Sequence, residues 1–289
     1  MRHPNAPRHY QPYHPMVGCQ LKMSRANKHF EELQDAAKAF IGSDPYSIVN
    51  EPDAKPNHYV VRLKIKREPS PELSPIIGDM VHNARASLDH LVWLLIRNAG
   101  NNPEIGRPQF PIFTRDPFDR TLYANTKKWK KALNLWNNQT EGLPPREVAI
   151  IKRMQPYKSR QIPYEHPLTR LNQLSNWDKH RELHFVGQAG AVTGTRVLEG
   201  VSPYAAIKPY WYLPDMEMLK EGAIIARYEA GPVPEGEPQV NTNLKLAFEI
   251  AFGEGSPLEG LRVEDTLYEI GRHVSDILWT FKLRFDGKL

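Results

Sequence analysis

The chain has little cysteine and no long apolar run, and these two absences exclude several classes of protein. Cys19 is the sole cysteine among 289 residues, which excludes an internal disulfide and a zinc site built from several thiolates. The longest apolar run, Leu91–Ile96, falls far short of the roughly 18 residues that a membrane span requires, and no apolar signal segment opens the chain. We therefore expect a cytoplasmic protein without membrane contact.

Most catalytic signatures are also missing from the sequence. It contains no Gly-rich phosphate loop, no Gly-x-Ser-x-Gly elbow and no zinc-protease helix motif. Nucleophilic catalysis by Ser or Cys is disfavoured, since Cys19 falls in a segment that we expect to be a tail. General acid–base chemistry by His and Asp is left as the main enzymatic option, with no cofactor expected.

Proline and positive charge are abundant. The 26 prolines predict many turns and rigid loops. The formal net charge is +5 and the isoelectric point is near 9.1. This balance mildly favours a polyanionic partner, so RNA or DNA is the candidate partner.

Three regions follow one another along the chain. Residues 1–20 are rich in Pro, His, Tyr and Arg and hold no acidic residue, which predicts a disordered tail. Residues 21–182 read as mainly helical with an early β-hairpin, and residues 183–289 as β-rich with a final helix. The predicted class is α+β: a helical bundle with small antiparallel sheets and a C-terminal helix that packs back.

Apolar spacing predicts the individual elements. Helices are expected over residues 21–41, 72–99, 117–138, 145–154, 167–180 and 259–284. Strands are expected over residues 46–50, 58–66, 183–188, 194–201, 207–213, 223–230 and 244–252. In the last helix the apolar positions step by four and three, which predicts a seam against the core: Val263, Leu267, Ile270, Val274, Ile277 and Phe281.

The helix expected over residues 72–99 has the most unusual pattern, GDMVHNARASLDH at 78–90. At about 100° per residue, one face carries an apolar stripe: Ile77, Val81, Ala84, Leu88, Leu91 and Leu95. Two polar groups lie beside it, one of His82, Arg85 and Asp89, the other of Asp79, Asn83 and His90. If neighbouring elements cover this helix, both groups must be paired.

This polar pattern has two interpretations. The spacing of four residues predicts an ion pair between Arg85 and Asp89. A carboxylate near His82 would raise the pKa of that histidine toward the physiological range, where it serves as an acid or a base. A structural polar network that clamps neighbouring helices explains the same residues equally well.

A second polar cluster, residues 176–181, closes the helix expected over 167–180. Asp178 and His180 are candidate catalytic residues, and Lys179 and Arg181 are candidate contacts to nucleic acid. His82, Asp89, Asp178 and His180 would be the candidate ligands of a metal site. His180 and His184 are four residues apart and could share a helix face as metal ligands, but no convincing carboxylate has the right spacing to be the third ligand. We therefore assign no metal ligand.

Several motifs of the chain resemble those of a widespread family of uncharacterised bacterial and phage proteins. The motifs are residues 78–90, 110–112 (Phe-Pro-Ile), 155–157 (Gln-Pro-Tyr) and 176–181. The resemblance spans most of residues 20–185 and implies no named activity.

Arg85-x4-His90 is also similar to the Arg-x4–6-His signature of HEPN-domain proteins, helical domains that include many metal-independent ribonucleases. The resemblance implies that Arg85 stabilises phosphate charge, that His90 is the acid or base at the 2′-hydroxyl, and that a homodimer completes the site. Three features depart from the family. Ala86 replaces a usual polar residue, and the expected β-hairpin interrupts the early helices. An ideal helix also points Arg85 and His90 about 140° apart.

A basic and aromatic run falls in the helix expected over 117–138: Lys127, Lys128, Trp129, Lys130 and Lys131. It could hold phosphates while Trp129 stacks on a base. The other interpretation is a solvated helix face with Trp129 packed inward.

The leading functional hypothesis is a HEPN-like, metal-independent endoribonuclease. Its candidate catalytic residues are Arg85, His90, His82, Asp89, Asp178 and His180. The alternative is a non-catalytic binding or structural protein, associated with a prophage or with defence, in which the polar helix is an internal clamp. A metal-dependent hydrolase is third.

Overall fold

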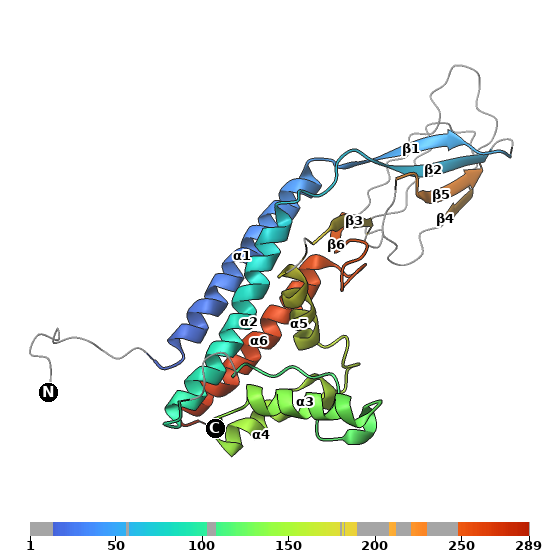
Figure 1. Ribbon diagram of the computed structural model, residues 1–289. Helices are drawn as coiled ribbons and strands as arrows, with labels where there is room; N and C mark the ends of the chain where they lie inside the picture. Colours follow the sequence, from blue (N-terminus) through green and yellow to red (C-terminus); the bar gives the residue numbers. More distant parts are fainter. Residues whose placement is uncertain are drawn as a thin grey trace, which may run out of the picture. The chain divides into compact units, whose positions relative to one another are not determined.

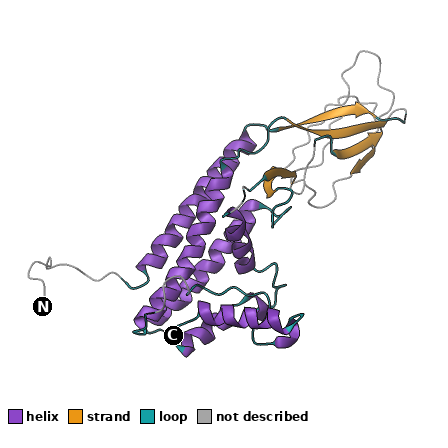
Figure 2. Cartoon of the chain, viewed as in Figure 1, coloured by secondary structure: helices purple, strands orange, loops and turns teal. Residues whose placement is uncertain are grey.

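The computed structural model describes residues 14–55, 58–102, 108–179, 181, 183–189, 208–211, 221–229 and 248–288. The chain divides into two compact units. The first comprises residues 1–30, 78–176 and 268–289, and the second comprises residues 31–77 and 177–267. Helices outweigh the strands, and the strands form two small antiparallel sheets (Figures 1 and 2). The predicted α+β class is confirmed.

Six α-helices are present in the described ranges: α1 (Val17–Gly42), α2 (Leu73–Asn98), α3 (Thr126–Gln139), α4 (Pro145–Arg153), α5 (Pro167–Asp178) and α6 (Val263–Phe285). Two short 3-10 turns, Arg120–Leu122 and Pro156–Lys158, lie between them. In the described part of the chain, no helix is both long enough and apolar enough to cross a bilayer.

The core of the first unit forms where α1, α2 and α6 meet. A side-chain carbon added at Gly271 of α6 would lie 3.6 Å from the terminal methyls of Met23 in α1 and Met80 in α2. The apolar stripe of α2 and the apolar seam of α6 are buried at every predicted position. Both periodicity predictions are therefore confirmed, because burial of one face holds such long helices in place.

Local signals set the helix ends around α3 and α4. Asn125 precedes α3, and its side chain accepts a hydrogen bond from the Lys128 backbone N–H at 2.9 Å. Pro145 occupies the first turn of α4, where its missing N–H costs nothing. The prediction of a single helix over 117–138 is wrong for the start of that helix. Asp119 caps a separate 3-10 turn there, and α3 begins afresh after Asn125.

The second unit contains both sheets. The larger has the order β1 (Tyr46–Pro52), β2 (His58–Ile65), β5 (Ile224–Glu229) and β4 (Lys208–Trp211). The smaller pairs β3 (Phe185–Ala189) with β6 (Phe248–Phe252), with Gly187 opposite Ile250. All of these pairings are antiparallel. The strand expected over 194–201 lies outside the described residues.

The first helix begins earlier than the sequence predicts. Helix α1 starts at Val17, inside the range expected to be a tail, and Cys19 is buried at 2% exposure. Burial raises the pKa of the Cys19 thiol to about 11. The thiol is therefore protonated at neutral pH and is a poor nucleophile. Cys19 is thus disfavoured as a nucleophile because it is buried, and not because it lies in a tail.

Candidate functional site

Arg85 and Asp89 of α2 both bind the backbone of one residue, Phe110. The Arg85 Nη2 donates to the Phe110 carbonyl at 2.7 Å, and the Phe110 N–H donates to Asp89 Oδ1 at 2.9 Å. Arg85 Nη2 also lies 3.0 Å from Asp89 Oδ1, which is the ion pair that the sequence predicts. We call this arrangement the Phe110 clamp. It satisfies both backbone groups of a residue whose side chain is fully buried.

Gln155 fixes the residues that follow Phe110. Its Nε2 donates to the Pro111 carbonyl at 2.8 Å, and its Oε1 accepts from the Phe113 N–H at 3.0 Å. Gln155 is 1% exposed. The extended segment 108–113 is therefore held by side chains of α2 and of Gln155, and three motifs that are distant in sequence meet in one structural network.

The remaining polar residues of α2 divide between solvent and backbone. His82 and Asp79 are exposed, so the expectation that both polar groups are covered and paired is wrong for them. Asn83 is buried and donates to the Asp79 carbonyl at 2.8 Å. Among the described residues, none covers the outer edge of α2 at His82 enough to bury its side chain.

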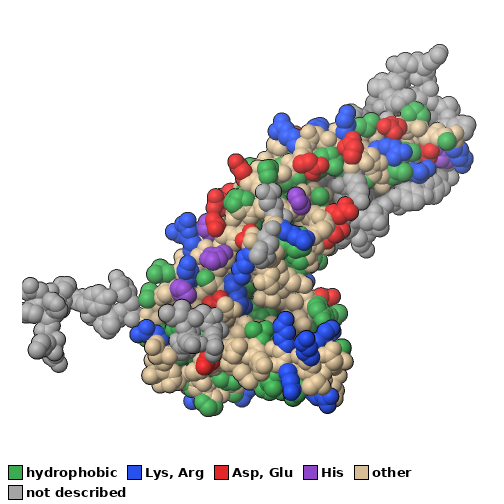
Figure 3. Space-filling view, viewed as in Figure 1, with side chains coloured by type: hydrophobic (Ala, Val, Ile, Leu, Met, Phe, Trp, Pro, Cys, Tyr) green, Lys and Arg blue, Asp and Glu red, His purple; other side chains and the backbone are tan. Residues whose placement is uncertain are grey.

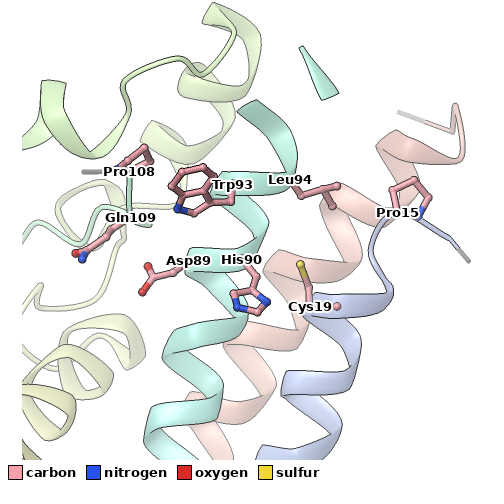
Figure 4. Close-up of a pocket in the computed structure, with 9 residues that line it drawn as sticks. Pro15, Cys19, Asp89, His90, Trp93, Leu94, Pro108 and Gln109 are labelled. Atoms are coloured by element: carbon pink, nitrogen blue, oxygen red, sulfur yellow. The ribbon is translucent and has the colours of Figure 1, made fainter. Parts of the chain in front are cut away.

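His90 lies at the edge of a hollow of about 520 Å³ between α1, α2 and the start of segment 108–113 (Figure 4). Figure 4 shows Asp89 and His90 side by side on α2, with Trp93 one turn further along and next to Pro108. Arg85 is not one of the described residues that line the hollow. Arg85 therefore binds Asp89 and Phe110, while His90 borders the hollow.

All residues of the second predicted cluster except Asn176 belong to the second unit. Asp178 ends α5 and belongs to the second unit, whereas His82, Arg85, Asp89 and His90 belong to the first. The Arg181 guanidinium lies 4.6 Å from the centre of the Trp177 ring, Lys179 is exposed, and His180 lies outside the described residues. Within the described ranges, no group of three or more His, Cys, Asp or Glu side chains is placed to hold a metal ion.

Helix α3 carries the predicted basic and aromatic run. Lys127, Lys128, Lys130 and Lys131 are exposed, and Trp129 is half-buried. The Trp129 indole N–H donates to the Pro117 carbonyl at 3.1 Å. This bond favours the interpretation in which the indole packs inward while the four lysines face the solvent.

Comparison of the chain with models of protein families, with characterised proteins and with solved structures finds no match. The likeness to the bacterial and phage family and to HEPN-domain proteins stays a prediction from the motifs.

A buried histidine pair was not predicted from the sequence. The rings of His166 and His273 (the latter on α6) meet edge to face with centroids 4.6 Å apart. His166 Nδ1 accepts a hydrogen bond from the Leu168 N–H at 3.2 Å, so it caps α5 in its neutral form. Burial, and next the charge of His273, lower the pKa of His166 to about 4. The pKa of His273 is lowered as well, chiefly by burial. The charge of Asp276 opposes this shift, and the charge of Arg272 adds to it.

The histidine pair predicts acid sensitivity. Because the pKa of folded His166 lies below its ordinary value of 6.5, its stabilisation is complete above about pH 6.5 and is lost as the pH falls toward 4. We expect the free energy of unfolding to be about 2 kcal/mol lower at pH 5 than at pH 8 from this group. Urea unfolding across this pH range measures the difference.

His166→Asn keeps a capping acceptor without an ionisable ring. It should flatten the pH profile, whereas the same change at exposed His82 should leave the profile unaltered. A wild-type profile that is flat between pH 8 and 5 would contradict the neutral capping role.

Proposed function

We propose that this protein is a non-catalytic RNA-binding protein that contacts RNA through its first unit. The observation that carries the proposal is the uneven distribution of charge between the units. The first unit holds 24 Lys and Arg and 11 Asp and Glu, a formal net charge of +13, although the whole chain carries only +5. The second unit accordingly has 14 basic and 22 acidic residues, a net charge of −8.

Much of the positive charge of the first unit lies in one stretch. Residues 111–160 contain 11 Lys and Arg and 4 Asp and Glu. On the face shown in Figure 3, Lys and Arg side chains outnumber acidic ones in the region of α3 and α4. Such a concentration of cations is the usual electrostatic footprint of nucleic-acid binding.

The four lysines of α3 are the strongest candidate contacts. All four are exposed, and none makes an ion pair with another residue that the structure describes. Unpaired surface cations can neutralise phosphates without first breaking a bond within the protein, and they release counterions when they do so.

The Phe110 clamp supports the non-catalytic part of the proposal. Arg85 binds Asp89 and the Phe110 carbonyl, so phosphate binding by Arg85 would compete with the fold. The ribonuclease hypothesis remains the alternative, and the exposure of His90 beside Asp89 favours it. A metal-dependent hydrolase, a homodimer and a cytoplasmic location stay predictions from the sequence.

Removing the α3 lysines is expected to weaken RNA binding strongly. For the variant Lys127→Gln, Lys128→Gln, Lys130→Gln and Lys131→Gln, we expect the dependence of log affinity on log salt to become shallower by about 3, from about 0.7 per lost contact. Fluorescence anisotropy with a single-stranded RNA oligonucleotide, titrated at several salt concentrations in EDTA, measures this change.

A matched control removes four lysines from the second unit: Lys38→Gln, Lys55→Gln, Lys64→Gln and Lys66→Gln, all at exposed positions. It changes net charge equally and should leave the salt slope nearly unaltered. Equal losses in both variants would contradict binding through α3. Cleavage of the RNA in EDTA by the wild type, abolished by His90→Ala, would establish the ribonuclease alternative instead.

A further inference from the structure

We propose that the hollow beside His90 binds an unstacked nucleobase of the RNA and prefers a base with an exocyclic amino group. This inference rests on the proposed function and gives it a chemical specificity. The hollow lies wholly within the first unit, between the start of α1, the second half of α2 and residues 108–109 (Figure 4). Its volume of about 520 Å³ falls within the range of about 300–1,000 Å³ that is typical of small-ligand sites.

One wall of the hollow offers a flat apolar surface. Trp93 and Leu94 of α2 contribute to it, and Pro108 lies next to Trp93. Trp93 is half-buried, so its ring is partly held by the protein and partly open. A base that leaves its own stack can replace the lost stacking on such an indole.

Polar groups one turn before Trp93 on α2 have unused hydrogen-bonding capacity. Both contacts of the Asp89 carboxylate in the Phe110 clamp involve Oδ1, which leaves Oδ2 without a partner among the described residues. Oδ2 can accept a hydrogen bond and cannot donate one. It therefore suits the amino group of cytosine, adenine or guanine. In uracil the ring donor N3–H lies between two carbonyl oxygens, which repel a carboxylate.

Two further side chains can complete the recognition. His90 and Gln109 both line the hollow, and both are exposed. Within the described ranges neither side chain has a hydrogen-bond partner. Each can donate or accept, so they can adapt to the edge of the base while Asp89 sets the preference for an amino group.

The charge of the hollow fits a neutral ring better than a phosphate. No Lys or Arg is among the described residues that line it, and Arg85 already neutralises the Asp89 carboxylate from outside. Phosphates would find an acceptor and no cation there. The backbone of the RNA is therefore assigned to the lysines of α3, and a base to the hollow.

Gly18 gives a way to fill the hollow without changing its polar groups. A side-chain carbon at Gly18 would lie 3.9 Å from His90 Nδ1, which is ordinary contact. Gly18→Leu should therefore be tolerated in α1 and should place its side chain in the hollow. Gly42→Leu is the matched control, because nothing lies within 4 Å of a side-chain carbon at exposed Gly42.

The test compares single-stranded oligonucleotides of A, C and U by fluorescence anisotropy with the full chain. We expect the wild type to bind A and C about threefold to tenfold more tightly than U, which is the effect of one net hydrogen bond. Gly18→Leu should weaken binding of A and C about tenfold and abolish the preference, since it removes stacking as well. Gly42→Leu should match the wild type.

Three results would overturn the inference: equal binding of A, C and U by the wild type, a preference that survives in Gly18→Leu, or the same loss in Gly42→Leu. Each of these leaves RNA binding through α3 intact, so the two proposals fail separately. Should Gly18→Leu not fold, Gln109→Ala gives a second test, because among the described residues only the backbone N–H of Gln109 is bonded, to the Gln139 carbonyl. Gln109→Ala should weaken binding of A and C and keep the preference that Asp89 sets, so affinities equal to those of the wild type would then count against the site.

Discussion

Asp89→Ala is expected to lower the free energy of unfolding by about 3 kcal/mol, because it leaves the Arg85 charge without a counter-ion and the Phe110 N–H without an acceptor. The Arg85 side chain is only 12% exposed and would lose its carboxylate. The Phe110 N–H, which now donates to Asp89 Oδ1, would lose its acceptor. Urea unfolding followed by circular dichroism measures the change.

Two companion variants separate the clamp from other roles of Asp89. Asp89→Asn keeps an oxygen for the Phe110 N–H and removes the charge, so its cost should be smaller than that of Asp89→Ala. Asp79→Ala alters an exposed carboxylate of the same helix and should stay within about 0.5 kcal/mol of the wild type. If Asp89→Ala were as mild as Asp79→Ala, the Phe110 clamp would not be a structural element.

Gly187→Ala should destabilise the second unit by about 3 kcal/mol or more, because the new methyl has no room. Gly187 of β3 is buried. A side-chain carbon there would lie 1.6 Å from the Tyr46 hydroxyl oxygen and 2.4 Å from the Tyr46 Cζ. Tyr46 itself is buried at 7% exposure in β1, so moving either its side chain or the Gly187 backbone would cost stability. Thermal and urea unfolding measure the loss.

A double-mutant cycle identifies the cause. Tyr46→Leu removes the atoms that the methyl would meet and should recover part of the stability that Gly187→Ala loses, so the two changes should be strongly non-additive. Gly42→Ala supplies the control, since that position opens to solvent. Simple additivity of the two changes would place the cost of Gly187→Ala elsewhere, for example in the β3–β6 pairing.

Several features of this protein could be predicted from neighbouring residues alone. The apolar stripe of α2 and the seam of α6 recur at helical spacing, and both are buried as predicted. The Arg85–Asp89 ion pair follows from a spacing of four residues on one helix. Strand β2 follows from the alternation of apolar and polar residues over 58–66.

The partner of that ion pair could not be predicted in the same way. Phe110 lies 21 residues beyond Asp89, and no local pattern relates the two positions. Gln155 shows the same limit, since its contact with Pro111 spans 44 residues. His166 and His273 are further apart still, and their capping and ring contacts depend on how α5 meets α6.

The sequence by itself determined most of the helices and strands and the apolar faces of α2 and α6, because both depend on residues a few positions apart. Only the tertiary structure decided which polar side chains are covered. Along α2 it ties Arg85 and Asp89 to Phe110 and leaves His82 in water and His90 at the edge of a hollow. The physical reason is that a polar group is covered by segments from elsewhere in the chain. The spacing of residues along one helix does not predict which segments these are.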